Sequence, residues 1–269
     1  MTAPAAIGVD VGSTTWKAVV IDRSGAVLAS LVEPADPLVE AQTERGLVEL
    51  RRRAGAPPDL PVGATGYGRK RVAAGRSLTE ITCHARGAFA RTRRPGVLLD
   101  IGGQDTKVIR IDARGEVMDF AMNDKCAAGT GRFLEVILAR LRVPLGEVAS
   151  RVAAAPRAVS VSSTCTVFAE SEVVSLVAGG EPVEGIVRGL HASLARRVAS
   201  LAGSVPPAEA VFLSGGVALN PAMVAALEEA LGRPVSVVPD PQLVGALGAA
   251  LAAAEAAAAA SPRPVAPPG

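Results

Sequence analysis

The feature that most restricts the fold of this chain is an internal repeat with a constant offset of 90 residues. Residues 8–22 read GVDVGSTTWKAVVID and residues 98–112 read LLDIGGQDTKVIRID. Each segment is an apolar run, a small polar turn and a second apolar run, followed by a turn before a third run. This pattern predicts a β-hairpin that opens a β-meander, and it predicts two similar halves. A chance match is the alternative, but the positions that coincide are the polar ones, namely Asp10 with Asp100, Gly12 with Gly102, Lys17 with Lys107 and Asp22 with Asp112.

The composition excludes several classes of protein. With 269 residues, 49% of them hydrophobic, the chain can bury a sizeable core and is not a disordered protein. A formal net charge of +2 does not indicate a nucleic-acid binder. The apolar stretches are too short and interrupted to span a membrane, and no signal peptide is visible, so we expect a cytoplasmic protein.

Apolar spacing and breakers place the remaining elements in two lobes. We expect an N-terminal lobe over 1–95, a C-terminal lobe over 96–251, and an Ala/Pro-rich, flexible tail over 252–269. Helices are also expected after Cys126 and after Cys165. The other predicted helices span about 37–54, 77–91, 183–202 and 221–231 and start again near 242, and short strands are predicted at 62–65, 211–213 and 235–238.

The two hairpin turns have the residue types that bind phosphate. In the first turn, the backbone amides and hydroxyls of residues 12–15 can face one anion, and Lys17 follows. In the second turn, Gly102 and Gly103 let the backbone approach closely, and Gln104 or Asp105 can orient a water. Each turn alone could be an ordinary hairpin, but the pair predicts a clamp for a triphosphate between two lobes. The first predicted strand of each hairpin ends near a carboxylate, Asp10 in one and Asp100 in the other. These carboxylates suit Mg²⁺, which prefers oxygen ligands.

A third glycine turn, SGGVALN at 214–220, stands between a predicted strand and a predicted helix. It lets a flat base or a phosphate lie against the backbone, although an ordinary strand–helix turn has the same pattern. Neither a Walker A loop nor a GxGxxG fingerprint is present in the sequence. The small residues at 245–250 predict close helix packing.

The cysteines number three, which argues against a disulfide framework. Cys126 and Cys165 each precede a predicted helix, whose positive end suits an anionic sulfur ligand. One chain cannot form a Cys₄ site from these two, but two chains related by a two-fold axis can. Buried, inert thiols are the alternative. Cys83 is expected in the core, and the two histidines, His84 and His191, are expected in packing or surface roles.

The motifs together resemble the actin–hexokinase–acetate kinase superfamily, and within it the ATPase activators of 2-hydroxyacyl-CoA dehydratases, which are related to the ATPase subunits of benzoyl-CoA reductase. The resemblance implies a duplicated actin/ribonuclease H-like α/β fold with two lobes around an ATP cleft. It is carried by VDVGSTTWK, GYGR, EITCHARGA, DIGGQDTK, NDKCAAGTGRFLE, SSTCTVFAESEV and SGGVALN. The two cysteine segments are the specific part, because sugar kinases and actins have no reason to contain them.

The resemblance also implies an activity and its cofactors. The chain would be an ATPase coupled to electron transfer, with one 4Fe–4S cluster bridging a homodimer through Cys126 and Cys165 of each chain. It would take one electron from ferredoxin or flavodoxin and pass it to an acyl-CoA dehydratase or reductase. ATP hydrolysis would rotate the lobes and so change the exposure of the cluster.

The implied nucleotide site uses residues from all three turns. Gln104 or Asp105 would position the attacking water, and Asp10 and Asp100 would hold Mg²⁺. The residues expected to hold phosphates or to border the nucleotide are Gly12, Ser13, Thr14, Thr15, Lys17, Gly102, Gly103, Gly215, Gly216 and Gln242.

Two other functions fit parts of the sequence. A small-molecule kinase of the same superfold would use Asp105 as the substrate base. A non-redox, ATP-responsive interaction module would only pack its cysteines. The acyl-CoA substrate of the partner enzyme, and the choice between a homodimer and a sister subunit, are not readable from the sequence.

Overall fold

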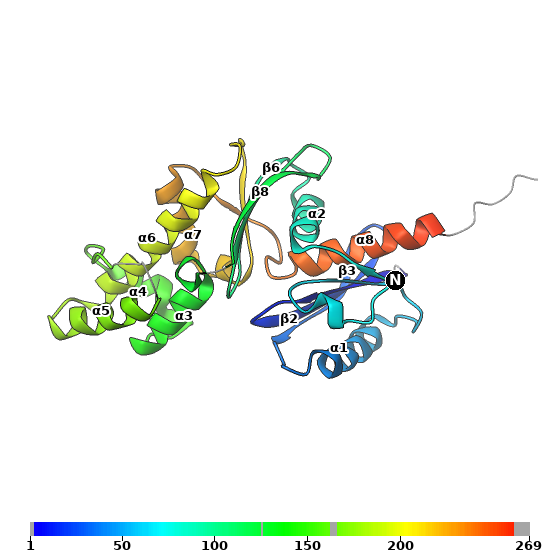
Figure 1. The fold of residues 1–269 in the computed structure, drawn as a ribbon, viewed down its shortest axis with the longest axis horizontal. Helices are drawn as coiled ribbons and strands as arrows, with labels where there is room; N and C mark the ends of the chain where they lie inside the picture. The colour runs from blue at the N-terminus through cyan, green and yellow to red at the C-terminus, as the bar shows by residue number, and fades with distance from the viewer. Residues whose placement is uncertain (1–2, 125, 162–165, 261–269) are drawn as a thin grey trace, which may run out of the picture. The chain divides into compact units, whose positions relative to one another are not determined.

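The computed structural model describes residues 3–124, 126–161 and 166–260 of the chain. Backbone contacts divide the chain into two compact units, one formed by Met1–Ala90 with Leu243–Gly269 and the other by Arg91–Gln242. Each unit contains one five-stranded sheet with helices (Figure 1). The predicted duplication of an α/β unit is therefore confirmed.

The sheet of the first unit has the strand order β3-β2-β1-β4-β5. Strands β1, β2 and β3 form the predicted antiparallel meander, whereas β4 lies parallel to β1 and β5 lies parallel to β4. The register pairs Asp10 with Lys17, so the loop between them lies at the end of the hairpin. The strands are β1 (Pro4–Val11), β2 (Thr15–Asp22), β3 (Val27–Pro34), β4 (Val62–Thr65) and β5 (Arg76–Ser77).

Helix α1 (Val39–Ala54) packs against β2 and β3. Trp16 on β2 is fully buried beneath this helix, where Gly46 leaves room for its ring, since a Cβ at that position would collide with ring carbons. Its indole Nε1 donates to Thr43 Oγ1 at 3.1 Å. The tryptophan thus joins the first hairpin to α1 and is not packed within the hairpin alone.

Helix α8 (Val244–Ala260) lies on the same sheet and contacts β1, β2 and β4. Its approach depends on glycine in the strands, because a Cβ at Gly8 would collide with the carbonyl of Ala246. Helix α2 (Glu80–Thr92) packs on α8 with equal closeness, since a Cβ at Gly248 would collide with the backbone of Cys83. The predicted close packing of small residues is confirmed. The sequence placed this last helix in the second lobe, whereas the structure packs it in the first unit because only glycine-bearing strands admit a helix so near.

The sheet of the second unit has the order β10-β9-β6-β7-β8 and repeats the first one. Strands β6, β7 and β8 form an antiparallel meander, and β9 lies parallel to β6. The pairing of Asp100 with Lys107 repeats that of Asp10 with Lys17. The strands are β6 (Gly96–Ile101), β7 (Thr106–Ile111), β8 (Val117–Asn123), β9 (Val211–Ser214) and β10 (Ser236–Val237).

The second acidic position of the repeat closes the turn after each hairpin. Asp22 Oδ1 accepts from the backbone N–H groups two and four residues further on, at 2.8 and 3.0 Å. Asp112 Oδ1 makes the same two bonds, both at 2.8 Å. These aspartates recur because each forms an Asx-type turn, which is a structural role.

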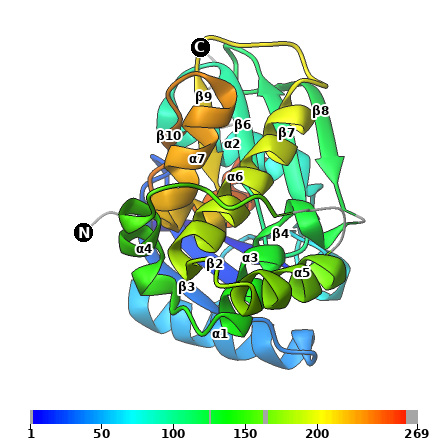
Figure 2. The same ribbon diagram turned by 90° about the vertical axis from the view of Figure 1, so that its left-hand side faces the viewer.

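The second unit differs from the first in the long segment between β8 and β9, which carries most of its helices. These helices lie on one side of the sheet, toward the viewer in Figure 2, and share one core with β6, β7 and β9. The helices of this unit are α3 (Gly131–Arg140), α4 (Val148–Ala154), α5 (Thr166–Ala178), α6 (Val183–Ala202) and α7 (Pro221–Leu231). Short 3₁₀ turns in the chain are η1 (Arg69–Arg71), η2 (Ala127–Gly129), η3 (Leu145–Glu147) and η4 (Gly216–Leu219).

The element predictions hold closely for α6 and α7, whose bounds agree with the predicted 183–202 and 221–231. Helix α4 and strand β5 were not predicted, because both are short, at seven and two residues. The flexible tail predicted over 252–269 is wrong for its first part, because α8 extends to Ala260, and residues 261–269 lie outside the described residues. Among the described helices, none combines the length and apolar character of a membrane span.

Candidate nucleotide site and cysteine turn

The first hairpin turn joins a buried carboxylate to a lysine. Asp10 is 4% exposed, and Lys17 Nζ donates to its Oδ2 at 3.0 Å. Gly12 N donates to Thr15 O at 3.1 Å and closes the turn. The side chain of Ser13 is exposed, and those of Thr14 and Thr15 are partly exposed. The predicted residues of this turn therefore lie together, with polar groups at the surface above a partly buried ion pair.

Two glycines hold the Asp10 carboxylate from either side. Gly66, with φ +92°, follows β4, and a Cβ there would lie 2.6 Å from Asp10 Oδ1. At the start of α8, a Cβ on Gly245 would lie 2.9 Å from Asp10 Oδ2 and 2.9 Å from His84 Nε2. The sequence analysis did not assign Gly66, Gly245 or His84 to this site. The GYGR motif at 66–69 was the available signal, since its two glycines after a predicted strand indicate close backbone approach.

The second hairpin turn has the same backbone and a different ion pair. Asp100 is 2% exposed and accepts from Ser214 Oγ at 2.8 Å. Lys107 Nζ lies 2.6 Å from Asp105 Oδ2 and 3.5 Å from Asp100 Oδ2. Gln104 is exposed at the tip of the turn. The structure thus brings Asp100, Asp105 and Lys107 together and leaves Gln104 toward solvent.

The third glycine turn stands at the end of β9, beside the second hairpin. Gly215 has φ +88°, and a Cβ there would collide with the carbonyl of Ile101 at the end of β6. Gln242 Nε2 lies 3.5 Å from the position of a Cβ on Gly216, and Gly215 N donates to Pro241 O at 2.9 Å. The predicted Gly215, Gly216 and Gln242 are therefore neighbours.

A buried histidine fixes the end of this turn. His191, 1% exposed on α6, donates from Nδ1 to Val187 O at 2.8 Å, and its Nε2 accepts from Asn220 Nδ2 at 2.9 Å. Asn220 in turn caps α7 by accepting from Ala222 N at 3.0 Å. Burial lowers the pKa of His191, which keeps the imidazole neutral and able to accept. The packing role predicted for His191 is correct, but its contact with the SGGVALN turn had no signal in the sequence.

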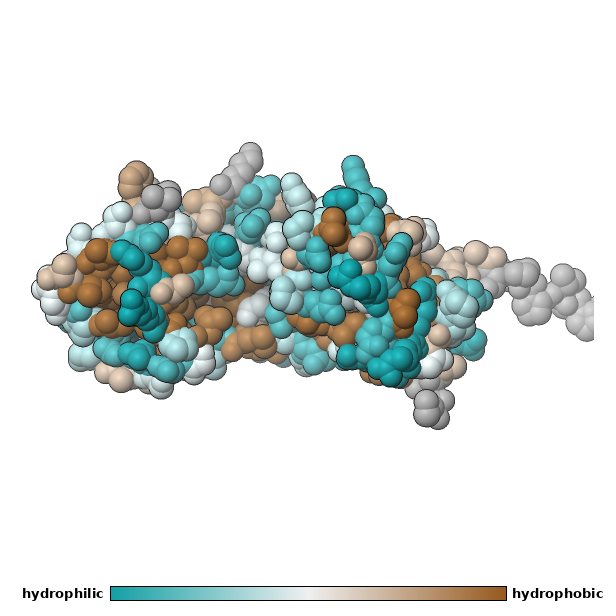
Figure 3. Space-filling view, turned by 90° about the horizontal axis from the view of Figure 1, so that it is seen from below, coloured by the Kyte–Doolittle hydropathy of each residue, from teal (hydrophilic) through white to brown (hydrophobic). Residues whose placement is uncertain are grey.

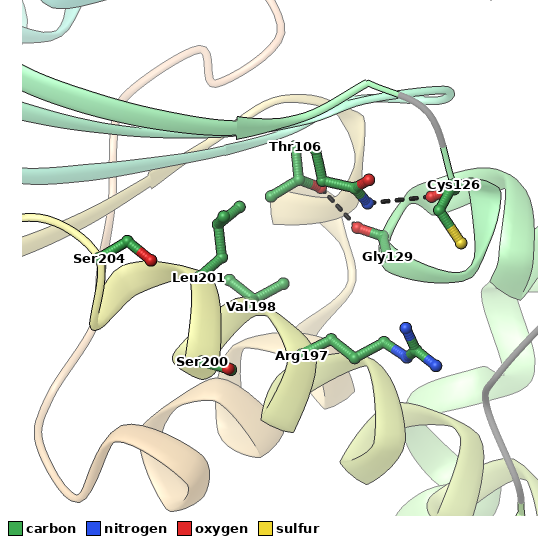
Figure 4. Close-up of a pocket in the computed structure, with 9 residues that line it drawn as sticks. Thr106, Cys126, Gly129, Arg197, Val198, Ser200, Leu201 and Ser204 are labelled. Carbon is green, nitrogen blue, oxygen red and sulfur yellow. Dashed lines mark hydrogen bonds between the residues drawn. The ribbon is translucent and has the colours of Figure 1, made fainter.

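The cysteine turn follows β8. Cys126 is half-buried and lines a cavity of about 320 Å³ (Figure 4). Its carbonyl accepts from Asn123 Nδ2 at 2.9 Å. The expectation that it directly precedes a helix needs correction, because the 3₁₀ turn η2 intervenes and α3 starts only at Gly131. The cavity is lined by Thr106, Asn123, Cys126, Gly129, Arg197, Val198, Ser200, Leu201 and Ser204.

Of the other two cysteines, Cys165 lies outside the described residues. Cys83 is fully buried on α2, and burial raises the pKa of its thiol to about 11, so the expected core role is confirmed. Within the described part of the chain, no three His, Cys, Asp or Glu side chains come together as a metal site.

Comparison with known proteins decides the family. The sequence model of the BadF/BadG/BcrA/BcrD ATPase family matches residues 7–253. The chain belongs to this ATPase family. It is 42% identical over 257 residues to the (R)-2-hydroxyglutaryl-CoA dehydratase activating ATPase of Acidaminococcus fermentans, covering 94% of this chain and 98% of that protein. It is also 41% identical over 249 residues to the 2-hydroxyisocaproyl-CoA dehydratase activator of Clostridioides difficile, covering 91% and 93%.

Solved structures confirm the fold. The activator of the 2-hydroxyisocaproyl-CoA dehydratase from Clostridium difficile with bound ADPNP superimposes with a TM-score of 0.89 at 38% identity, covering 97% of this chain and 99% of that one. A ROK family glucokinase from Streptomyces griseus, at 16% identity and a TM-score of 0.59, shares the fold alone. The actin–hexokinase type of α/β fold that the family resemblance implied is confirmed.

Proposed function

We propose that this member of the ATPase family is an activator that hydrolyses ATP and transfers one low-potential electron to a 2-hydroxyacyl-CoA dehydratase or a benzoyl-CoA reductase-type partner. The observation that carries the proposal is the position of Cys126, on a turn hydrogen-bonded to the second phosphate hairpin. The activator names of the relatives support the same function, and they differ in the acyl group. The acyl-CoA substrate of the partner therefore stays open.

The nucleotide half of the proposal rests on the paired hairpins. Asp10 and Asp100 are buried carboxylates at equivalent strand ends, and carboxylate oxygens suit a hydrated Mg²⁺. Lys17 neutralises phosphate charge on the first turn. The remaining phosphate ligands are the backbone and hydroxyls of Gly12, Ser13, Thr14, Thr15, Gly102 and Gly103, and Gly215, Gly216 and Gln242 border the nucleoside.

The contacts of the second turn support different roles for Gln104 and Asp105, which the sequence did not distinguish. Asp105 is engaged by Lys107 at 2.6 Å, and a Cβ on Gly102 would lie 2.7 Å from its Oδ1, so the carboxylate is held in place. Gln104 is exposed and can turn toward a water. We therefore assign the positioning of the attacking water to Gln104 and the anchoring of Lys107 to Asp105.

The redox half of the proposal requires two cysteine ligands from each of two chains. Cys126 is half-buried and lines a cavity, which suits a thiolate ligand, but the described residues of one chain supply no complete donor set. Cys126 and Cys165 of two chains would together supply four thiolates. A second copy is favoured by apolar side chains exposed on α5, such as Phe168 and Val174. Figure 3 shows apolar side chains over the helical part of this unit, at the left of the view.

The bound 4Fe–4S group would supply one-electron transfer. A reduced ferredoxin or flavodoxin loses one electron, and the acceptor enzyme gains one. ATP and water give ADP, phosphate and a proton. The protein's own part is to bind the nucleotide, to orient the water and to hold Cys126.

The decisive experiment is anaerobic purification with iron and sulfide counted per chain, a mass in solution, and ATP-dependent reduction of candidate dehydratases. We expect a brown dimer with about two irons per chain. The Cys126→Ser variant should lose the iron, and the Cys83→Ser variant should keep it because that thiol is buried in the core. A colourless, iron-free monomer after anaerobic reconstitution would contradict the proposal, and sugar-dependent ADP release would favour a kinase.

A further inference from the structure

The turn of the second hairpin, residues 102–105, is called the second phosphate loop below. It is hydrogen-bonded to the start of the helix that follows the cysteine turn. Gly102 O accepts from Gly131 N and Gly103 O accepts from Arg132 N, both at 2.9 Å. Gly131 and Arg132 open α3, and the first N–H groups of a helix have no acceptor within the helix. The loop therefore supplies the acceptors that the start of α3 needs.

Thr106 makes a third link between the loop and the cysteine turn. It opens β7 directly after the loop, is 1% exposed, and donates from Oγ1 to Gly129 O at 2.6 Å (Figure 4). Gly129 ends the 3₁₀ turn that begins after Cys126. The bond from Asn123 Nδ2 to the Cys126 carbonyl holds the other end of this turn. A continuous set of hydrogen bonds thus connects the loop to Cys126 within one unit.

The rigidity of the peptide group relates these links to a bound phosphate. A trans peptide plane holds its C=O and N–H on opposite sides, and no cis bond occurs among the described residues. Gly102 O shares its plane with Gly103 N–H, and Gly103 O shares its plane with Gln104 N–H. Because both carbonyls face α3, both N–H groups point away from it, where an anion can accept them. A phosphate that draws either N–H rotates the plane and moves an acceptor of α3.

We propose that phosphate binding at the second loop is transmitted to Cys126 through these bonds, and that Thr106 is the positioning residue that makes the cysteine turn follow the loop. The inference rests on the proposed function, because it takes a nucleotide phosphate as the ligand of the loop. It goes beyond that function because it places the coupling inside one unit and does not require the two units to rotate.

The repeat offers a matched control in the other unit. The position equivalent to Thr106 is Trp16, whose indole donates to Thr43 Oγ1 on α1. Thr43 is 4% exposed, so it is a buried threonine hydroxyl bonded to a phosphate hairpin, as Thr106 is. Its removal should perturb the first hairpin without touching the cysteine turn.

The test measures alkylation of Cys126 by iodoacetamide in anaerobic, iron-free protein, with the labelled peptide identified by mass spectrometry. The rate is compared without nucleotide and with saturating Mg·ADPNP, whose affinity is measured for each variant by equilibrium dialysis. We expect the wild-type rate to change about fivefold or more between the two states. Thr106→Val should bring this ratio close to one, whereas Thr106→Ser and Thr43→Val should keep it. Buried Cys83 serves as the unreactive internal reference.

Each remaining outcome overturns a specific statement. A wild type that binds Mg·ADPNP with no change in Cys126 labelling overturns the coupling and leaves the proposed ATPase function intact. A Thr106→Val variant that keeps the wild-type ratio overturns the role of Thr106. A wild type that fails to bind Mg·ADPNP overturns the proposed function and the coupling with it. If circular dichroism shows Thr106→Val to be unfolded, Asn123→Ala replaces it, and an unchanged ratio in that variant overturns the coupling.

Discussion

The two hairpins of this protein share a backbone and differ in their partners. Both place an aspartate opposite a lysine in the same register. In the first, Lys17 is bonded to Asp10, whereas in the second, Lys107 lies nearer to Asp105 and Asp100 is bonded to Ser214. Duplication has thus kept the strand geometry while the ion pairs were reassigned.

The neighbours of the two hairpins differ even more than their ion pairs. The first is covered by α1, which contacts it through Trp16. The second is bonded at the equivalent position to the turn that carries Cys126. One copy of the hairpin is therefore bonded to a packed helix, and the other is bonded to the segment that is redox-active under our proposal. The difference teaches that the specialised role lies in what the hairpin is bonded to, because the hairpin itself is nearly unchanged.

Removing the two lysines should separate the hairpins most strongly. Lys107 is 2% exposed and close to two carboxylates, so Lys107→Met removes the buried cation beside both and should lower the free energy of unfolding by about 3 kcal/mol or more. Lys17 is more exposed and has one such partner, so Lys17→Met should lose about 1–2 kcal/mol. Urea unfolding measures both, with the exposed Lys70→Met as the control. Equal losses would contradict the reassignment of the ion pairs.

Of the two polar residues of the second turn, replacing Gln104 should lower kcat, whereas replacing Asp105 should lower the stability of the fold. Gln104→Ala should lower kcat for ATP hydrolysis by about 100-fold, since the group that orients the water is lost. Its exposed side chain predicts an unchanged stability. Asp105→Asn should instead destabilise the fold, because Lys107 loses its nearest partner. Steady-state hydrolysis and urea unfolding on both variants check the division, and a reversed pattern would assign the water to Asp105.

The equivalent glycines of the two units should behave alike. Gly66 and Gly215 have positive φ, and a Cβ on either would collide with a backbone carbonyl of the neighbouring strand. Alanine at each should cost about 2–3 kcal/mol of unfolding free energy. Gly55→Ala is the control, since φ is also positive there but no atom lies within 4 Å, so strain of about 1 kcal/mol is the whole cost. Thermal unfolding of the three variants measures the difference. A Gly66 variant as stable as the control would show that the two turns are not equivalent.

Acidification should lower the stability of the second unit through His191, and this is the smallest of the four predicted effects. Burial holds the folded-state pKa of this group below its usual value of about 6.5. Between these two values the unfolded chain binds more protons, so stability is full above about pH 6.5 and falls as the pH drops toward the folded pKa. His191→Gln should reduce the fall in Tm between pH 7.5 and 5.5. An identical fall in both proteins would show that His191 does not contribute.

Local pattern was enough to predict the hairpins, the meanders and most helices. The alternation of apolar and polar residues and the punctuation by glycine and aspartate act over a few residues, so they are visible in one segment at a time. The same holds for the positions of the phosphate turns and for Gly215 and Gly216. The roles of Asp22 and Asp112 also follow from local bonds, although the repeat alone did not distinguish them from site residues.

Other features depend on residues far apart in the sequence. The bond from Ser214 to Asp100 spans 114 residues, and that from Thr106 to Gly129 spans 23. His84 and Gly245 meet beside Asp10 only because α2 and α8 pack together. No periodicity encodes such meetings, since they follow from how the elements pack.

The sequence by itself therefore determined that this chain has two copies of one hairpin and cysteines outside any disulfide pattern, because those features follow from local residue types and spacing. Tertiary structure alone decided that α8 completes the first unit, that Lys107 is bonded to Asp105, and that Thr106 connects a phosphate loop to Cys126. The physical reason is that hydrogen bonds and close glycine contacts act over about 3 Å, and only the packed fold brings distant segments within that range.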